Sequence, residues 1–396
     1  MSYKKKIALI IFIVLFGVYS FWVYAFFYNY DIYEALTESN FYEKSYRWLF
    51  FNSSNINYEP KLINFSESEK NSLTIVTPFL DTKIDKNKNL IYCSSLQISW
   101  IDLINNLIKD PIGIENPPEY LSRLNFSKAQ KFITSDDSFL SIVGQASKAY
   151  KKDIFINKNH SFEKLLSNIT SENNIEAENI HIVSLMLKQV EFNNEFEGIC
   201  GHEFKFSDKT IHVKAFGIKD YSIEQRQRVY GNVYTYHDTS ESHIRPVKFA
   251  IKLRTLSKSD EVILSNFIPE ETLEKTYKNI EFLVNNKYRY NPFFANSYIT
   301  IPAIDFDVMC NYDKLTNKKL TNEKYKNRIL EKVIQRIRFK LNGYGTFSLS
   351  YNNWGIVSRP QHYIINGPFF IYIKNKNSDM PYFMAYIAND ELLEKE

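Results

Sequence analysis

The sequence is poor in cysteine and histidine, and neither residue type occurs in a metal-binding pattern. Its 396 residues include three cysteines (Cys93, Cys200 and Cys310) and seven histidines. There is no CxxC pair and no HxH or HxxxH spacing, so the sequence predicts no metal site. An odd number of cysteines leaves at least one free thiol. Cys93 lies in an apolar run and is expected to be buried, while a Cys200–Cys310 disulfide stays open as an alternative.

Catalytic motifs are also missing. There is no G-x-S-x-G motif, no P-loop and no dinucleotide fingerprint. Cys200, His202 and Glu203 are neighbours in sequence, but a nucleophile and its base must converge in space with a third orienting group, so we interpret them as a turn. Asp305 and Asp307 would face the same side of a strand, as cation ligands or acid–base groups do. We expect them instead at a solvated strand end. The sequence therefore predicts no catalytic residue, no cofactor and no enzymatic activity.

Excess charge of one sign is absent as well. The net charge is +4 over 396 residues, which gives no support for nucleic-acid binding. Lysine-rich stretches such as residues 83–88 are interpreted as solvated loops. Hydrophobic residues make up 44% of the chain and charged residues 24%, a balance typical of one large or two medium folded domains.

One segment near the N-terminus contains no charged residue. It covers residues 7–28, and a helix of about 20 apolar residues spans a bilayer. Lysines precede it and acidic residues follow it, so the positive-inside rule places the N-terminus in the cytoplasm and the main domain outside. We predict a single-pass signal anchor in residues 1–30, a connector in 31–70 and the folded domain in 71–396. The alternative is a signal peptide cleaved after Val23-Tyr24-Ala25, but the apolar run exceeds the usual length of about 7–15 residues.

Hydrophobic periodicity predicts a mixture of helices and strands after residue 70. Helical spacing appears over 96–108 and 269–284, where Pro269 would lie in the first turn. Apolar runs or two-residue alternation predict strands over 180–187, 247–254, 261–268, 298–304, 331–341, 369–373 and 382–387, the last two joined as a hairpin by a polar turn. This pattern predicts an α+β domain with large antiparallel or mixed sheets.

The C-terminal part of the chain resembles the serpin family. Residues 335–345 resemble the strand and hinge that lead out of the central serpin sheet into the reactive loop. Residues 366–373 and 381–389 resemble the two strands of the closing hairpin, at the expected spacing. Weaker similarities occur in the same order upstream, at residues 89–100, 180–196, 213–218, 261–268 and 299–302. The resemblance covers about residues 71–392 and is closest to divergent bacterial serpin-like proteins. It implies a large central sheet with smaller sheets, surrounded by helices.

The sequence departs from the family pattern at sites that bear on function. Gly367 replaces the arginine of the hairpin motif, Tyr344 the glutamate before the hinge glycine, and Phe192 the tryptophan of the central strand. An inhibitory serpin needs a long loop that starts with small residues, because the cleaved loop inserts into the sheet. Here the hinge and reduced reactive-loop region comprises Gly343, Gly345, Thr346, Phe347, Leu349, Tyr351 and Arg359.

Two functions follow as the main alternatives, and a third, an enzyme with an unrecognised site, is the least favoured because the sequence offers no set of candidate residues. The first is a non-inhibitory serpin-fold protein with a binding or structural role at the cell surface or in the periplasm. The second is a serine or cysteine protease inhibitor that acts by loop cleavage and insertion, with Arg359 as the cleaved residue. The strict alternation of large apolar and small polar residues from Gly345 to Asn352 predicts a strand rather than a mobile bait loop, which favours the first function.

Overall fold

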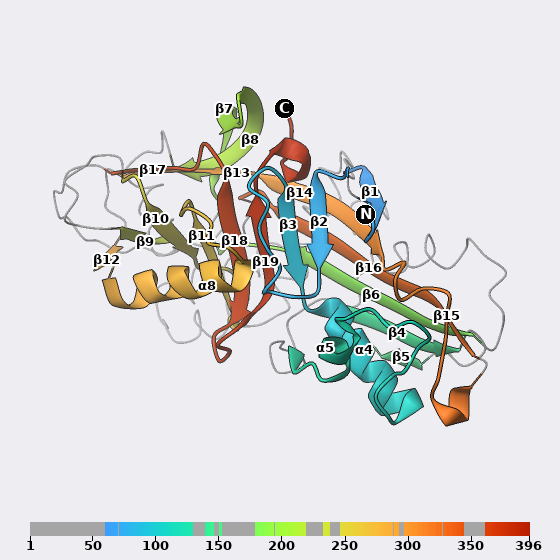
Figure 1. Ribbon diagram of the computed structural model, residues 1–396. Coiled ribbons are helices and arrows are strands. Elements are labelled where there is room, and N and C mark those ends of the chain that lie inside the picture. Colours follow the sequence, from blue (N-terminus) through green and yellow to red (C-terminus); the bar gives the residue numbers. More distant parts are fainter. Residues whose placement is uncertain are drawn as a thin grey trace, which may run out of the picture. The chain divides into compact units, whose positions relative to one another are not determined.

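The computed structural model describes residues 60–69, 71–129, 139–145, 150–152, 179–193, 195–218, 233–237, 246–287, 289–292, 297–326, 328–343 and 361–396 (Figure 1). These residues belong to one unit that extends from Pro60 to Glu396. The predicted anchor, residues 7–28, lies outside them. Within the described ranges, no helix combines the length and the apolar character that a membrane span requires.

Three sheets make up most of the described unit (Figure 1). The seven-stranded sheet has the order β1 (Leu62–Ser66), β14 (Ile304–Asn311), β16 (Ile329–Leu341), β6 (Ile180–Gln189), β4 (Phe139–Gln145) and β5 (Tyr150–Lys152), with β15 (Lys318–Lys319) also paired to β16. The eight-stranded sheet has the order β12 (Arg289–Pro292), β9 (Val233–His237), β10 (Phe249–Leu253), β11 (Asp260–Ser265), β18 (Phe369–Asn375), β19 (Pro381–Ile387), β3 (Asn89–Cys93) and β2 (Thr74–Thr77).

The four-stranded sheet has the order β17 (His362–Ile364), β13 (Tyr298–Pro302), β8 (Lys209–Ile218) and β7 (Glu197–Phe206). The helical elements of the described ranges are α4 (Ser95–Leu103), α5 (Leu121–Asn125), α8 (Leu273–Phe282) and the short η1 (Ile104–Ile108), η4 (Leu283–Lys287), η5 (Glu323–Tyr325) and η6 (Asp390–Leu392). The prediction of an α+β fold with large mixed sheets is confirmed, and the helices are few compared with the strands.

The hairpin formed by β18 and β19 lies between two hydrophobic cores. In β18, Phe369, Ile371 and Ile373 face the main core, which extends under the seven-stranded sheet. Phe370 and Tyr372 face the second core, which α8 covers (Figure 1). Because both faces are covered, the strands read as continuous apolar runs rather than alternating ones.

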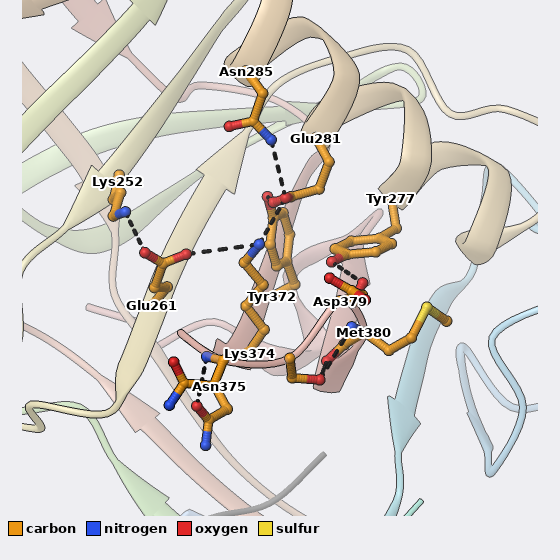
Figure 2. Close-up of polar contacts among 12 residues, drawn as sticks. Lys252, Glu261, Tyr277, Glu281, Asn285, Tyr372, Lys374, Asn375, Asp379 and Met380 are labelled. Carbon is orange, nitrogen blue, oxygen red and sulfur yellow. Dashed lines mark hydrogen bonds and ion pairs between the residues drawn. The ribbon is translucent and has the colours of Figure 1, made fainter. Parts of the chain in front are cut away.

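Helix α8 begins later than the sequence predicted. Pro269 lies outside the helix, and Thr272 is the N-cap residue: its hydroxyl oxygen accepts a hydrogen bond from the Lys275 backbone N–H at 3.2 Å. Figure 2 shows how the other end of α8 is joined to the sheet. Glu281 accepts hydrogen bonds from the Tyr372 hydroxyl at 2.5 Å and from Lys374 Nζ at 2.7 Å. Apolar packing in the second core and the hydrogen bonds of Glu281 together hold the helix against β18.

The chain enters the unit through a strand. Residues 62–66, within the range interpreted as connector, form β1, which pairs in parallel with β14 from Leu62 opposite Asp307 to Ser66 opposite Asn311. Beyond the strand, the Glu67 carboxylate accepts a hydrogen bond from the Tyr120 hydroxyl at 2.8 Å. The three cysteines are free, which rules out the Cys200–Cys310 disulfide: Cys310 is buried and Cys200 is exposed.

Candidate functional site

The candidate site is the line of contact between β6 and β16, which we call the seam, together with the two ends of residues 344–360. The two strands pair directly and in parallel, from Leu330 opposite Ile180 to Lys340 opposite Gln189, with one irregularity between Leu330 and Lys332. Beyond the strand ends, the Val190 N–H donates to the Lys340 carbonyl at 2.9 Å. The seam is therefore closed along its whole length.

On the inner side of the seam, polar side chains form hydrogen bonds with neighbouring elements. The Gln335 side chain is fully buried and donates from Nε2 to the Ser95 hydroxyl at 2.7 Å and to the Cys93 carbonyl at 3.0 Å. Its Oε1 accepts from the Tyr312 hydroxyl at 2.7 Å. Across the seam, the Ser184 hydroxyl donates to the Ile334 carbonyl at 3.3 Å. Gln335 therefore ties β16 to the start of α4 and the end of β3, and a buried amide without these partners would be costly.

Burial makes Cys93, next to this network, chemically inert. Desolvation raises the pKa of its thiol to about 11, so the nucleophilic thiolate is scarce at neutral pH. The expectation that Cys93 is buried as a small hydrophobic residue is confirmed.

On the other face of β14 and β16, two ion pairs cross between the strands. Asp307 and Arg336 form a bidentate pair, with Nε to Oδ1 at 2.9 Å and Nη2 to Oδ2 at 2.6 Å. Their side chains are 8% and 6% exposed, respectively. The expectation of a solvated strand end at Asp305 and Asp307 was therefore wrong, because arginines two residues apart on β16 meet the aspartates and allow them to be buried.

Asp305 forms the second pair, with Arg338, and Lys340 Nζ lies 3.7 Å from its Oδ2. Burial nevertheless raises the pKa of the Asp305 carboxyl above its ordinary value, against the opposing effect of the two cations. Within the described ranges, no group of three or more acidic, histidine or cysteine side chains could hold a metal ion. The two aspartates thus act as structural partners of arginine.

Gly343 marks the point where the chain leaves the seam. Its φ is +79°, a conformation that favours glycine. A Cβ atom at this position would lie 2.7 Å from Cβ of Phe216, which is closer than atoms of this kind approach. The Gly343 carbonyl also accepts a hydrogen bond from the Phe196 N–H at 2.9 Å. Glycine is therefore required here for both backbone conformation and space.

A buried aromatic cluster packs around this exit. The ring centroids of Phe192 and Phe196 are 4.8 Å apart, and that of Phe216 lies 5.6 Å from Phe196 and 6.1 Å from Phe192. Phe192, where the family pattern has a tryptophan, is fully buried. The cluster fixes the position at which the chain departs from β16.

The chain returns from residues 344–360 at Gln361. The Gln361 carbonyl accepts from the Tyr298 N–H at 2.8 Å, and β17 then pairs in parallel with β13 from Tyr298 opposite His362 to Thr300 opposite Ile364. The two described residues that flank this segment, Gly343 and Gln361, are thus both held by backbone hydrogen bonds.

Most of the predicted site residues lie outside the described ranges. They are Gly345, Thr346, Phe347, Leu349, Tyr351 and Arg359. The predicted strand over 345–352 is therefore still a prediction.

The sequence analysis did not identify Gln335 as a site residue. The signal that could have found it is a single polar residue at an inward-facing position of an apolar strand. The sequence analysis also missed Phe216, which no local pattern connects with Gly343.

Cys200, His202 and Glu203 lie within strand β7 rather than in a turn. The pairing of β7 with β8 shifts register between Ile199 and His202, and Gly201 has φ +69°. This irregularity leaves Cys200 exposed and buries His202, whose Nε2 lies 2.8 Å from the Ile365 carbonyl oxygen. The three residues do not converge on a catalytic arrangement.

Comparison with protein-family models finds no matching family. Comparison with curated protein sequences finds no match. Among solved structures, this chain is similar to a serpin from the trematode Schistosoma haematobium, with TM-score 0.46, 11% identity, and coverage of 76% of this chain and 94% of that chain. It is also similar to Serpin48 from the insect Tenebrio molitor, with TM-score 0.45, 10% identity, and coverage of 76% and 92%.

A third similar structure is uncleaved ovalbumin, with TM-score 0.44, 9% identity, and coverage of 76% of this chain and 93% of that chain. The matched structures are serpins, as the sequence resemblance predicted. At these TM-scores and identities, the similarity assigns no family, no activity and no residue role to this chain. A bacterial origin is still a prediction.

Proposed function

We propose that this protein is a membrane-anchored, non-inhibitory serpin-fold protein, whose extracytoplasmic domain binds a partner or has a structural role at the cell surface or in the periplasm. The observation that carries the proposal is the alternation of the large apolar residues Phe347, Leu349 and Tyr351, which loop insertion would have to place in the closed seam between β6 and β16. An inhibitor that acts by loop insertion has to open such a seam.

Opening the seam has an energetic cost that the following residues are poorly suited to offset. A strand entering between β6 and β16 would break their shared hydrogen bonds, and its inward side chains would need room in a packed interior. Phe347, Leu349 and Tyr351 are large apolar residues that alternate along the first part of the segment. Added volume in a packed core is destabilising by roughly 1–3 kcal/mol per site. These side chains would therefore oppose insertion.

The length of the segment supports the same conclusion. Residues 344–360 lie between Gly343, at the end of the seam, and Gln361, which is bound to β13. At about 3.3 Å per residue, a chain of this length makes one strand and its return, with little left to display to a protease. The alternative function, protease inhibition, is favoured by the resemblance of residues 335–345 to a serpin hinge, and would use Arg359 as the cleaved residue.

Incubation with trypsin-, chymotrypsin- and elastase-like proteases tests this part of the proposal. We expect no covalent complex on denaturing gels. As a control, Arg359→Ala should leave the result unchanged. A band at the summed mass that resists denaturation would establish the inhibitor function instead, and its loss in Arg359→Ala would identify Arg359 as the cleaved residue.

The membrane anchor is supported by the uncharged residues 7–28 with lysines on the N-terminal side. Fractionation of cells that produce a C-terminally tagged protein tests it. We expect the tag in the membrane fraction, resistant to extraction by high salt and alkali. Recovery of a soluble extracytoplasmic protein that begins near Phe26 would show that the segment is a cleaved signal peptide.

A further inference from the structure

A buried ion pair joins the seam to the eight-stranded sheet. Lys188, near the C-terminal end of β6, pairs with Asp260, the first residue of β11. The two side chains are 10% and 1% exposed, respectively. Lys188 Nζ also lies 5.8 Å from the centre of the Tyr382 ring, at the beginning of β19. Because both charges are largely removed from water, separating them would be costly.

Backbone contacts join the same two regions. The β10–β11 turn, residues 254–259, lies beside the residues that follow β6 in the chain. Its Leu256 N–H donates to the Glu191 carbonyl at 2.9 Å, and its Thr255 forms an isolated β-bridge with Phe192. The ion pair is therefore the side-chain part of a contact that also has a backbone part.

This contact lies at the exit end of the seam, where the chain departs from β16. On β6, Lys188 is the register partner of Phe339 of β16. Two residues later, the Val190 N–H donates to the Lys340 carbonyl at 2.9 Å. The last residues of β6 are thus bound to β16 within their own sheet and to the β10–β11 turn of the other sheet.

β16 contacts the eight-stranded sheet in a different way at this end. Phe339 stacks on Phe383 of β19, with ring centroids 4.7 Å apart and ring planes inclined by 17°. Apolar packing is non-directional, whereas a hydrogen-bonded ion pair requires a particular distance and angle. At the exit end, β6 therefore has a directional attachment to the eight-stranded sheet, and Phe339 supplies a non-directional one.

Stability alone does not account for the ion pair. Replacement of a buried ion pair by apolar residues of similar volume is often neutral or stabilising, because desolvation of the two charges offsets their attraction. Buried ionic groups can instead select one arrangement among several of similar free energy, since their hydrogen-bonding geometry is exacting. Here the arrangement that the pair selects is the position of β6 against the β10–β11 turn.

We propose that the Lys188–Asp260 ion pair is a lock on the exit end of the seam. It holds the end of β6 on the β10–β11 turn, so β6 does not move away from β16 at this end unless the buried pair separates. The lock is a property of contacts among β6, β16 and the β10–β11 turn, and it does not depend on whether the protein inhibits proteases or is anchored in a membrane.

Hydrogen exchange of the full-length protein in mild detergent tests the lock. The Val190 N–H reports on the exit end, and the Tyr312 N–H, which donates to the Val333 carbonyl at 3.0 Å, reports on the other end of β16. The exit ratio is the protection factor of Val190 divided by that of Tyr312, so a uniform loss of stability cancels. Lys188→Met and Asp260→Leu should each lower the exit ratio by at least about tenfold, because each removes a charge-assisted hydrogen bond that opening would otherwise have to break.

Two further variants make the test specific. Lys188→Met/Asp260→Leu removes both charges, so the free energy of unfolding should recover relative to the single variants, while the exit ratio stays low. This variant also serves if the single variants do not fold. Glu261→Gln is the matched control: Glu261 follows Asp260 in β11 but pairs with Lys252 and Lys374 inside the eight-stranded sheet (Figure 2). Its replacement should change the exit ratio by less than about threefold.

An exit ratio that is unchanged in Lys188→Met and Asp260→Leu would overturn the proposal. So would an equal fall in Glu261→Gln. A double variant whose exit ratio returns to that of the unmodified protein would also overturn it, because apolar packing would then hold β6 as well as the ion pair does.

Discussion

The hairpin of β18 and β19 and the seam of β6 and β16 are both buried, but they are held in different ways. The hairpin is apolar on both faces apart from Lys374 and Asn375, and it packs between two hydrophobic cores. The seam carries Gln335 and Ser184 on one face, and Arg336 on the other. Non-directional packing stabilises the hairpin, whereas the seam also depends on directional contacts that need specific partners.

This difference predicts which kind of substitution should lower the stability of each region most. Removal of volume should damage the hairpin most, because its side chains fill closed cores. Removal of one partner should damage the seam and its neighbour β14 most, because a polar group is then left buried alone. Substitutions in the hairpin, in the pair of β14 and β16, and at the exit from the seam test this contrast.

Phe370→Ala should lower the free energy of unfolding by about 3–5 kcal/mol. Phe370 is fully buried on β18 and stacks on Tyr386 with ring centroids 4.7 Å apart. Chemical denaturation measures the change. Phe126→Ala is the control, since that ring is 71% exposed, and its loss should change stability by no more than about 0.5 kcal/mol. Equal effects of the two variants would contradict the assignment of Phe370 to a closed core.

Arg336→Met should lower the free energy of unfolding by about 3 kcal/mol, because it leaves the Asp307 carboxylate buried without its arginine. The double variant Asp307→Leu/Arg336→Met should recover most of this loss, since an apolar pair of similar volume replaces the ion pair. Denaturation of the two variants in parallel measures both effects. A double variant that is less stable than Arg336→Met would mean that the charges themselves, rather than their pairing, are required.

Gly343→Ala should lower stability by roughly 1–3 kcal/mol, because it combines a left-handed backbone conformation with a clash against Phe216. Gly198→Ala is the matched control, because a Cβ atom there meets nothing within 4 Å. Thermal unfolding of both variants measures the difference. If Gly343→Ala behaves like the control, the exit from the seam is not constrained by Phe216.

The elements that were predictable are those whose signals are local. Apolar runs identified β6, β18 and β19, and the polar turn between the last two identified their hairpin. Helical spacing identified α4 as well. The start of α8 was misplaced, because Pro269 and Thr272 both suit the first turn of a helix. The Thr272 side chain caps the helix, and the N–H groups of Leu273 and Glu274 donate to the carbonyls of Thr82 and Leu80, so the helix begins after Thr272.

The partners across strands could not be read from the chain. Asp305 and Asp307 alternate as a solvated strand would, and only the register of β14 against β16 brings Arg338 and Arg336 to them. We interpreted Cys200, His202 and Glu203 as a turn, but all three lie in β7, whose register shift leaves Cys200 exposed while His202 is buried. Register depends on contacts between residues distant in sequence, which short-range patterns do not encode.

The fold class, the central apolar strands and the absence of a recognisable catalytic or metal-binding motif could all be read from the sequence alone. These follow from periodicity and residue chemistry, which act over a few residues. The direct pairing of β6 with β16, the hydrogen bond from Gln335 to Ser95, and the contacts of His237 and His202 with residues 361–365 became evident only in the folded molecule. Each of these requires two distant segments to be placed within hydrogen-bonding distance, and a polar side chain becomes structurally specific only once its partner is in place.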